Sequence, residues 1–573
     1  MTEAFTPEER AALAPYFTDL DGPVFALVNL PEVVKGALFA RYSRSPKSLR
    51  RLFLDEFMDD VGGETPPPSP PRLARGAPTE ESLPSPRLAR EEATGASSPP
   101  RETTVTRSRA EALYERVFLE YGDDSVAQLG GVHLACEGAS NILTKVLEWG
   151  RLMAYLEQST RYVPYDDRPG GRYRYHVPAE LDGPLRGQYV ATLDQAFETY
   201  RSWLPRLRDF YEARFPRAAG DSEQVHRLTI RAKALDTLRG LLPAATISNV
   251  GIYGTGQAYE QLLLRMRVHP LAEVRQCADR MLRELRKVIP AFLRRVDLAD
   301  RGGAWSAYLA ETREATQRIS DDVLGDAAPE LRDEVTLTDF DPEGEVKVVA
   351  AALYAASRLP DDQLLAAARR LSPEERLAVL QAYVGKRRNR RHKPGRAFER
   401  TAYRFDVLAD YGAFRDLQRH RLLTLEWQRL TPYHGSVIPA AVEEVGARAD
   451  WERVMEASAA LHDAIAARGL PDVASYAVAM AYRVRFYMEM NAREAMHVIE
   501  LRSAPQGHPT YRHLAQVMHG LIAERAGHRA IAAAMSFADH SQVALERLQA
   551  ERAAERRRGG VTSSDPTGSQ PPA

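Results

Sequence analysis

Apolar residues recur three and four positions apart along most of the chain, which is the spacing of an amphipathic helix. This pattern predicts helices at residues 37–57, 110–119, 132–156, 188–210, 346–353, 373–384 and 511–525. Alternation of apolar and polar residues is rarer, and residues 172–177 are the clearest strand candidate. We therefore expect a helix-dominated α+β fold.

Three segments interrupt this pattern. Residues 62–106 are rich in Pro, Ser, Arg and Glu and contain the pentapeptide PRLAR twice. Such a composition buries too little apolar surface to offset chain entropy, so it predicts a disordered insertion, and residues 551–573 predict a disordered tail. Periodicity weakens over residues 301–345, which we interpret as a connector between a first unit, 1–300, and a second, 346–550.

The bulk composition is that of a soluble globular protein, with 44% apolar and 27% charged residues over 573 positions. The formal net charge of -1 provides no overall field that would attract nucleic acid or membrane. The chain opens without a signal pattern and has no apolar run long enough to span a bilayer, so we expect a cytoplasmic protein. Cys136 and Cys277 lack metal-ligand spacing, which favours buried thiols over a disulfide or a metal site.

Two short charged stretches stand far apart in the chain. Arg419-His420-Arg421 offers guanidinium forks that fit phosphate oxygens, and each charge-assisted bond contributes about 1.5–3 kcal/mol. Taken alone, this tripeptide is more typical of a solvated basic face. The second stretch, Glu157-Gln-Ser-Thr-Arg161-Tyr162, lies in the first half.

Together these stretches resemble the two halves of one signature of the flavin-dependent thymidylate synthase family, Arg-His-Arg-x-x-Ser-x-Asn-Glu-x-Ser-x-Arg-Tyr. The chain is similar to a tandem fusion of two such units, in which each unit has lost the half that the other kept. The resemblance implies an α+β fold of two repeats.

For the second unit, the resemblance implies the flavin contacts. The residues that match the family's FAD-binding positions are Arg419, His420, Arg421, Asn491, Arg493 and His497. Arg502 matches the arginine that holds the uracil ring of dUMP, where a permanent cation would stabilise negative charge developing on that ring. Asn491 and His497 could alternatively be helix-surface donors. The unit departs from the family's nucleotide loop at Thr424, Glu426, Trp427, Arg429, Thr431 and Pro432.

For the first unit, the resemblance implies the dUMP contacts. The matching residues are Glu157, Ser159, Arg161, Tyr162 and Arg239, and Ser125 matches a flavin-contacting serine. Trp149-Gly150-Arg151 replaces Arg-His-Arg, so its own flavin contacts are expected to be lost. A gapless alignment of residues 254–265 with 491–502 pairs Arg265 with Arg502 and makes Arg265 a second candidate for the ring-side arginine.

The activity implied by the resemblance is conversion of dUMP to dTMP at one site shared between the units. Methylenetetrahydrofolate would give the carbon, and reduced FAD, regenerated by NADPH, would give the hydride. A homodimer of the fused pair would restore the four-unit assembly of the family. The alternative is a degenerate paralogue that binds nucleotide or flavin without turnover, or that acts as a regulatory partner.

One basic run falls outside these motifs. Residues 386–393, with the sequence KRRNRRHK, could bind nucleic acid or the glutamate tail of a folate, but a solvated loop is the favoured interpretation.

Overall fold

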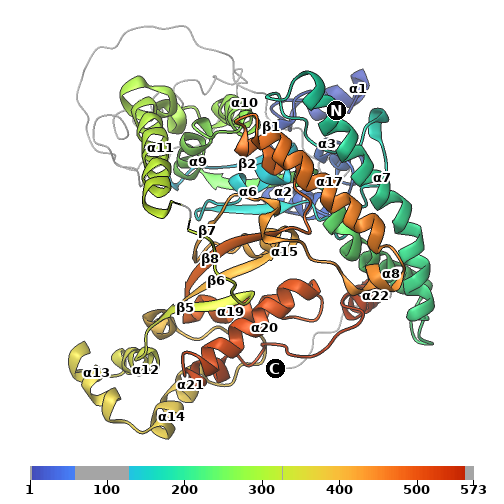
Figure 1. Cartoon of the computed structure of the whole chain (residues 1–573). Coiled ribbons are helices and arrows are strands. Elements are labelled where there is room, and N and C mark those ends of the chain that lie inside the picture. The colour runs from blue at the N-terminus through green and yellow to red at the C-terminus, as the bar shows by residue number, and fades with distance from the viewer. Residues whose placement is uncertain (1–2, 59–127, 326, 562–573) are drawn as a thin grey trace, which may run out of the picture.

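The computed structural model describes residues 3–58, 128–325 and 327–561 (Figure 1). Two four-stranded antiparallel sheets, one per unit, share one strand order, β1-β2-β4-β3 and β5-β6-β8-β7. The first sheet consists of β1 (Val24–Leu27), β2 (Gly131–Ser140), β3 (Met153–Glu157) and β4 (Ile247–Thr255). The second consists of β5 (Val335–Phe340), β6 (Ala402–Asp410), β7 (Thr424–Trp427) and β8 (Arg483–Asn491). The predicted insertion and Ser125 lie outside the described residues.

The helices that follow the long strands also repeat. In the first unit β2 runs directly into α6 (Asn141–Leu147) and β4 into α9 (Gly256–Arg267); in the second unit β6 runs into α15 (Tyr411–Leu417) and β8 into α19 (Ala492–Arg502). At each junction a capping side chain accepts a hydrogen bond from a backbone N–H of the helix that follows. In chain order, the capping residues are Ser140, Thr255, Asp410 and Asn491 for α6, α9, α15 and α19. The same capped strand-to-helix turns thus occur twice, as a duplicated unit requires.

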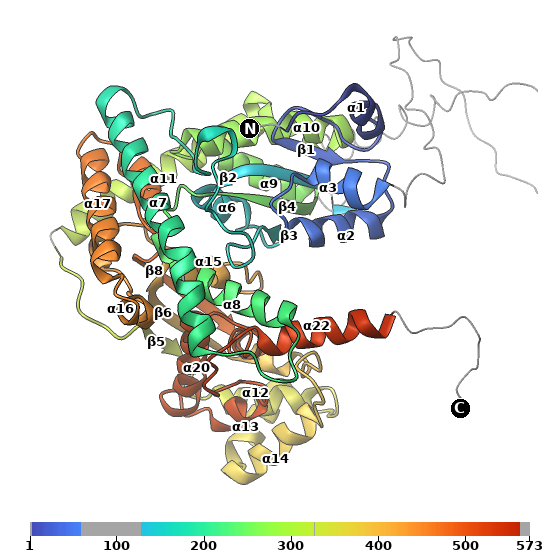
Figure 2. The ribbon, with the colours of Figure 1, turned by 90° about the vertical axis from the view of Figure 1, so that its right-hand side faces the viewer.

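The two units exchange parts of their cores. The core on the second sheet includes apolar residues of α7 (Gly183–Arg214) and α8 (Glu223–Leu238), which are first-unit helices. The core on the first sheet includes residues of α17 (Arg448–Ala466) and α18 (Pro471–Ala474), which are second-unit helices. Figure 2 shows α7 running from the level of the first sheet down past the second. Each unit therefore completes the core of the other.

Backbone hydrogen bonds reinforce this exchange. Ala244 N donates to Val478 O over 2.8 Å, and Met480 N donates to Leu242 O over 2.9 Å. The segment before β4 and the segment before β8 therefore pair with each other across the boundary between the units.

The other helices lie outside the two sheets, some against the strands and others against neighbouring helices (Figure 1). On the first unit they are α1 (Pro7–Leu13), α2 (Glu32–Tyr42), α3 (Leu49–Glu56) and α10 (Ala272–Val288), and the exposed α11 (Ala304–Leu324) follows. On the second unit they are α12 (Gly344–Tyr354), α13 (Asp361–Arg370), α14 (Pro373–Val384), α16 (Ala440–Glu444), α20 (Pro509–Glu524), α21 (Arg529–Ala534) and α22 (Leu548–Val561). None of the described helices is both long and apolar enough to cross a membrane.

Several predicted elements differ from the structure. Residues 132–156 are not a helix but β2, α6 and β3, because strands that are apolar on both faces mimic helical spacing. Residues 172–177 form no strand; Tyr175 makes one isolated bridge, to Thr246. The predicted connector contains α11 and also β5, which pairs with β6 of the second sheet.

The predicted tail begins as a helix. Residues 551–561 belong to α22, and Arg552 pairs with Asp221 at 2.5 Å, which ties this helix to the first unit. Both cysteines are buried and free, as predicted, although Cys136 lies in a strand.

Candidate functional site

Three arginines predicted as ligand contacts meet around one carboxylate that belongs to neither motif half. Asp416, on α15, contacts Arg419 and lies 3.5 Å from Arg239 and 3.8 Å from Arg502. Arg239 comes from the first unit and the other two arginines from the second. We call this group, together with Arg161 and Asp236, the Asp416 cluster.

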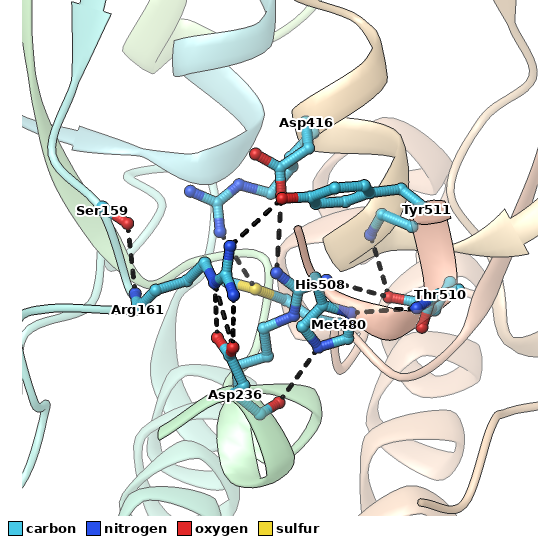
Figure 3. A network of polar contacts seen from close by, with 12 residues as sticks. Ser159, Arg161, Asp236, Asp416, Met480, His508, Thr510 and Tyr511 are labelled. Atoms are coloured by element: carbon cyan, nitrogen blue, oxygen red, sulfur yellow. Dashed lines mark hydrogen bonds and ion pairs between the residues drawn. The ribbon is translucent and has the colours of Figure 1, made fainter. Parts of the chain in front are cut away.

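Arg161 carries the first-unit loop into this cluster (Figure 3). Its guanidinium forms a bidentate pair with Asp236, with a shortest distance of 2.6 Å. It also donates to the hydroxyl of Tyr511 at 3.1 Å and to Gln506 O at 3.2 Å, both in the second unit. The predicted dUMP-binding loop and the second unit are therefore in direct contact.

Local structure explains the convergence. Arg419 follows α15 one helical turn after Asp416, so the two side chains meet at the spacing of i and i+3. Arg239 begins a short 3-10 turn directly after α8, and Arg161 follows β3. Since α8 packs in the core of the second sheet, the core exchange brings Arg239 to α15.

The charges of the cluster shift the acids within it. Burial alone would raise the pKa of Asp416, but the positive charges of Arg419, Arg502 and Arg239 outweigh burial and hold that pKa well below its usual range. Burial and Arg161 oppose each other in the same way at Asp236, whose pKa is lowered. Both carboxylates are therefore ionised at neutral pH.

Glu157, predicted to bind dUMP, links the units through a second ion-pair group. Its carboxylate accepts from Arg415 of α15 at 2.8 Å and from Lys145 of α6 at 3.2 Å. These two cations occupy equivalent positions in the two units. Burial would raise the pKa of Glu157, but Arg415 and Lys145 lower it to about 2. This buried carboxylate is thus a charged contact between the units.

His420 fixes the ring-side arginine. Arg502 Nε donates to His420 Nε2 at 2.8 Å, so the ring proton of neutral His420 resides on Nδ1, which lies 3.7 Å from Glu494. Burial, followed by the charge of Arg502, lowers the pKa of His420 well below its usual value. His420 is therefore uncharged and orients Arg502.

His420, Glu494 and His497 also place one possible metal-ligand atom each within 4.8 Å of one another. The positive charges of Arg502 and Arg419 near His420 would repel a cation at this position. Because Nε2 of His420 accepts from Arg502, a metal could bind this ring only through Nδ1, after Nδ1 has lost its proton. Burial raises the pKa of Glu494 to about 7 and lowers that of His497 to about 4.

The remaining predicted flavin residues of the second unit have structural contacts. Asn491 caps α19 by accepting from Glu494 N. Arg493 donates to Pro394 O at 2.9 Å and pairs with Glu399 at 3.2 Å. In the first unit, Ser159, which was predicted to bind dUMP, also has a structural contact. Its hydroxyl accepts a hydrogen bond from Arg161 N at 3.3 Å and stabilises the turn of its loop.

The third arginines of the two motifs form a reciprocal pair of contacts. Arg421 donates to Met153 O of the first unit, and Arg151 donates to Leu423 O of the second at 3.2 Å. Arg421 is equivalent to Arg151, and Met153 is equivalent to Leu423. The two loops therefore contact each other reciprocally, as in an isologous dimer interface. Arg151 therefore kept the contact of its counterpart although Trp149 and Gly150 diverged.

The predicted pairing of Arg265 with Arg502 is wrong by one residue. Thr255 and Asn491 cap α9 and α19 respectively, so the equivalent of Arg502 is Met266. A shift of one residue turns a side chain by about 100° around a helix. Arg265 consequently lies away from the Asp416 cluster, with its guanidinium 5.1 Å from the ring centre of Trp149.

Sequence reasoning missed the acids that organise the site. Asp416 and Asp236 belong to no stretch of the family signature. The one readable signal was the position of Asp416 three residues before Arg419 in a helical segment.

Comparison with known proteins identifies the family to which the chain belongs. The family model described as thymidylate synthase complementing protein matches residues 82–291 and 336–526. A UPF0159 protein of Chlamydia muridarum is 36% identical over 550 residues, covering 96% of this chain and 98% of that protein. UPF0159 protein Ta1429 of Thermoplasma acidophilum is 30% identical, covering 80% and 95%. A flavin-dependent thymidylate synthase of Mycobacterium sp. (strain JLS) is 31% identical over 189 residues, which are 32% of this chain and 70% of that enzyme. The chain therefore belongs to the flavin-dependent thymidylate synthase family, and it carries two units of that family in tandem.

Proposed function

We propose that the chain converts dUMP to dTMP, with methylenetetrahydrofolate as carbon donor, at the Asp416 cluster. The observation that carries this proposal is the convergence of Arg161 and Arg239 from the first unit with Arg419 and Arg502 from the second. The split motif is thus joined in space at one location. If the two motif halves were unrelated remnants, there would be no reason for their arginines to lie at the same place in the fold.

The side chains of the cluster fit an anionic cofactor or substrate. Arg239 Nη2 and Arg419 Nε are buried and have no hydrogen-bond acceptor among the described residues. Leaving a buried donor unsatisfied costs about 1–3 kcal/mol, so an oxygen-rich anion would be stabilised there. Arg419, His420, Arg421, Asn491, Arg493 and His497 would hold FAD. Bound FAD, reduced by NADPH, would supply the hydride.

The chain's own residues would bind and polarise dUMP. Arg239, Arg161, Ser159 and Glu157 are the residues proposed to hold the nucleotide. Arg502 is fixed by its hydrogen bond to His420, so its charge is positioned before the substrate arrives. With no Pro-Cys-His sequence at either cysteine, no protein thiol is proposed to attack the ring.

A second candidate is a protein that binds nucleotide or flavin without turnover. The observation in its favour is that Asp236 and Asp416 already pair with the arginines proposed for dUMP. A phosphate would have to compete with these carboxylates. The two candidates differ in product formation and not in binding.

The test combines a spectrum with an assay. Purified protein is incubated with FAD, desalted and scanned in the visible range with and without dUMP, and dTMP is then measured by chromatography after adding NADPH and methylenetetrahydrofolate. We expect a retained flavin band that shifts with dUMP, and dTMP formation that R161Q and R419Q each abolish. R404Q is the matched control, because Arg404 pairs with Glu489 at 2.9 Å on the second sheet away from the cluster. Retained flavin without dTMP would favour the second candidate, and no retained flavin with or without dUMP would refute the first.

A further inference from the structure

A cavity of about 390 Å³ lies where the two motif loops face each other. It is lined by residues 149–153 of the first unit, by 418, 420–421 and 423–426 of the second, and by Ala258, Gln261 and Arg265 of α9. Its volume is within the range of small-molecule sites. The cavity shares His420 and Arg421 with the predicted flavin residues, whereas Trp149 and Arg265 belong to it alone.

The internal repeat relates this cavity to the Asp416 cluster. Trp149 occupies the position equivalent to Arg419, and α9 the position equivalent to α19, which supplies Arg502 to the cluster. Met266 and Val146, the counterparts of Arg502 and Asp416, do not line the cavity. The cavity therefore lies between the two copies of the loop, next to the first-unit position at which the signature arginine has been lost.

The arginines of this cavity differ from those of the cluster in having no acid partner. Arg161, Arg239, Arg419 and Arg502 each pair with a carboxylate. In the described parts of the chain, no carboxylate lies within 4.0 Å of the guanidinium nitrogens of the three cavity arginines, which are Arg151, Arg265 and Arg421. None of these three guanidinium groups therefore forms an ion pair within the described chain.

Arg265 is the clearest case. It makes no hydrogen bond to any described residue, and burial lowers the pKa of its guanidinium. Glu426 is the carboxylate that lines the cavity, and burial raises its pKa. His420 is neutral. Burying a cation without a partner is costly, so an anion entering this space would be stabilised.

The cavity also has an aromatic wall. Trp149 is 39% exposed, and its indole N–H donates to Leu425 O at 3.2 Å, which fixes the orientation of the ring. Trp427 packs against it edge-on, with ring centres 5.7 Å apart. A fixed, partly exposed indole is a surface on which planar rings stack, and such stacking contributes about 1–3 kcal/mol.

We propose that this cavity is a binding site for a planar aromatic anion, separate from the Asp416 cluster. The ring of the ligand packs against Trp149, and its negative group is held by Arg265 with Arg151 and Arg421. This assignment goes beyond the proposed function, because Trp149, Arg151 and Arg265 are not among the residues proposed to hold FAD or dUMP. Of the residues that contact the ligand here, Arg421 alone is also proposed to hold FAD.

The experiment uses a matched pair of probes on the full chain. The probes are 8-anilinonaphthalene-1-sulfonate and N-phenyl-1-naphthylamine, which share their ring system but differ in the sulfonate. Fluorescence titration should show the sulfonate bound at least tenfold more tightly than the neutral probe. R265Q and W149L should each weaken sulfonate binding about tenfold, and R265K should retain most of it.

The control is R206Q, because Arg206 also lies over an indole, that of Trp203 at 4.9 Å, but on the surface of α7. Melting curves of all variants check that they are folded. Equal affinity for the two probes overturns the proposal, as does sulfonate binding that is the same in R265Q as in the native protein. Binding that depends on Arg493 but not on Arg265, measured with R493Q, would place the probe at the other site and also overturn it.

Discussion

Replacing Asp416 with asparagine tests whether one carboxylate neutralises the arginines of the proposed nucleotide site. The side chain is 14% exposed and faces Arg419, Arg239 and Arg502. Removing one partner of a buried ion pair costs about 3–5 kcal/mol. An unfolding entropy of about 2.1 cal/mol/K per residue amounts to roughly 1.2 kcal/mol/K for 573 residues, so the melting midpoint of D416N should fall by about 3 °C at pH 7.

The same variant should gain an anion site. With Asp416 uncharged, the buried donors of Arg239 and Arg419 are free to bind inorganic phosphate. A ligand at one hundred times its Kd stabilises the folded state by about 2.7 kcal/mol. Added phosphate should therefore raise the melting midpoint of D416N by about 2 °C more than that of the native protein.

The assay is a set of melting curves followed by circular dichroism over a phosphate series at constant ionic strength. D406N is the control. Asp406 pairs with Arg485 at 2.7 Å, and its side chain is 30% exposed, about twice as much as that of Asp416. Exposed pairs contribute about 0–1 kcal/mol. A midpoint for D416N no lower than that of D406N would refute the buried-pair reasoning. A phosphate response equal to that of the native protein would refute the anion site.

Three further predictions concern other ionisable groups. The pKa of Glu157 is about 2, so its stabilising contribution is present above the unfolded pKa of about 4.3 and is lost as pH falls towards 2. E157Q should therefore melt at a lower temperature than the native protein at pH 7, and its melting midpoint should change less between about pH 4.3 and 2. The pKa of Glu494 is about 7, so the folded protein holds a proton that the unfolded chain releases, and stability declines as pH rises from about 4.3 to 7; E494Q should flatten this decline in melting curves, and an unchanged slope would contradict it. Arg387 pairs with Glu500 at 2.6 Å with both side chains buried, so R387Q should cost about 3–5 kcal/mol by thermal melting, whereas R388Q, at an exposed neighbour, should be near neutral.

The accuracy of the sequence-based elements depends on how local their signals are. Helix α14 was predicted at its observed bounds from apolar spacing, and in the structure Ser372 and Glu375 form a capping box that fixes its start. Strand β8 was missed although its burial alternates strictly, a signal that was readable in the sequence. Strand β2 is buried on both faces over its centre, so periodicity could not separate it from a helix.

The residues of the candidate site likewise differ in whether their signals are local in the sequence. The motif residues were found because they are contiguous in sequence. The pair of Arg161 with Asp236 spans 75 residues, and that of Arg239 with Asp416 spans 177, so both depend on the fold. The basic run 386–393 was interpreted as a solvated loop, yet Arg387 within it is buried against Glu500.

The exchanged cores make this chain a heterodimer folded from a single polypeptide. In a homodimer every substitution is introduced twice, once on each side of the symmetry axis. Here Trp149 and Arg419 occupy equivalent places but are encoded separately, so either can change while the other is kept. Because α7 and α17 each complete the core of the opposite unit, the halves stay together at fixed stoichiometry however far their loops diverge. Fusion thereby removes the symmetry constraint that would otherwise force the two sites of such a pair to remain identical.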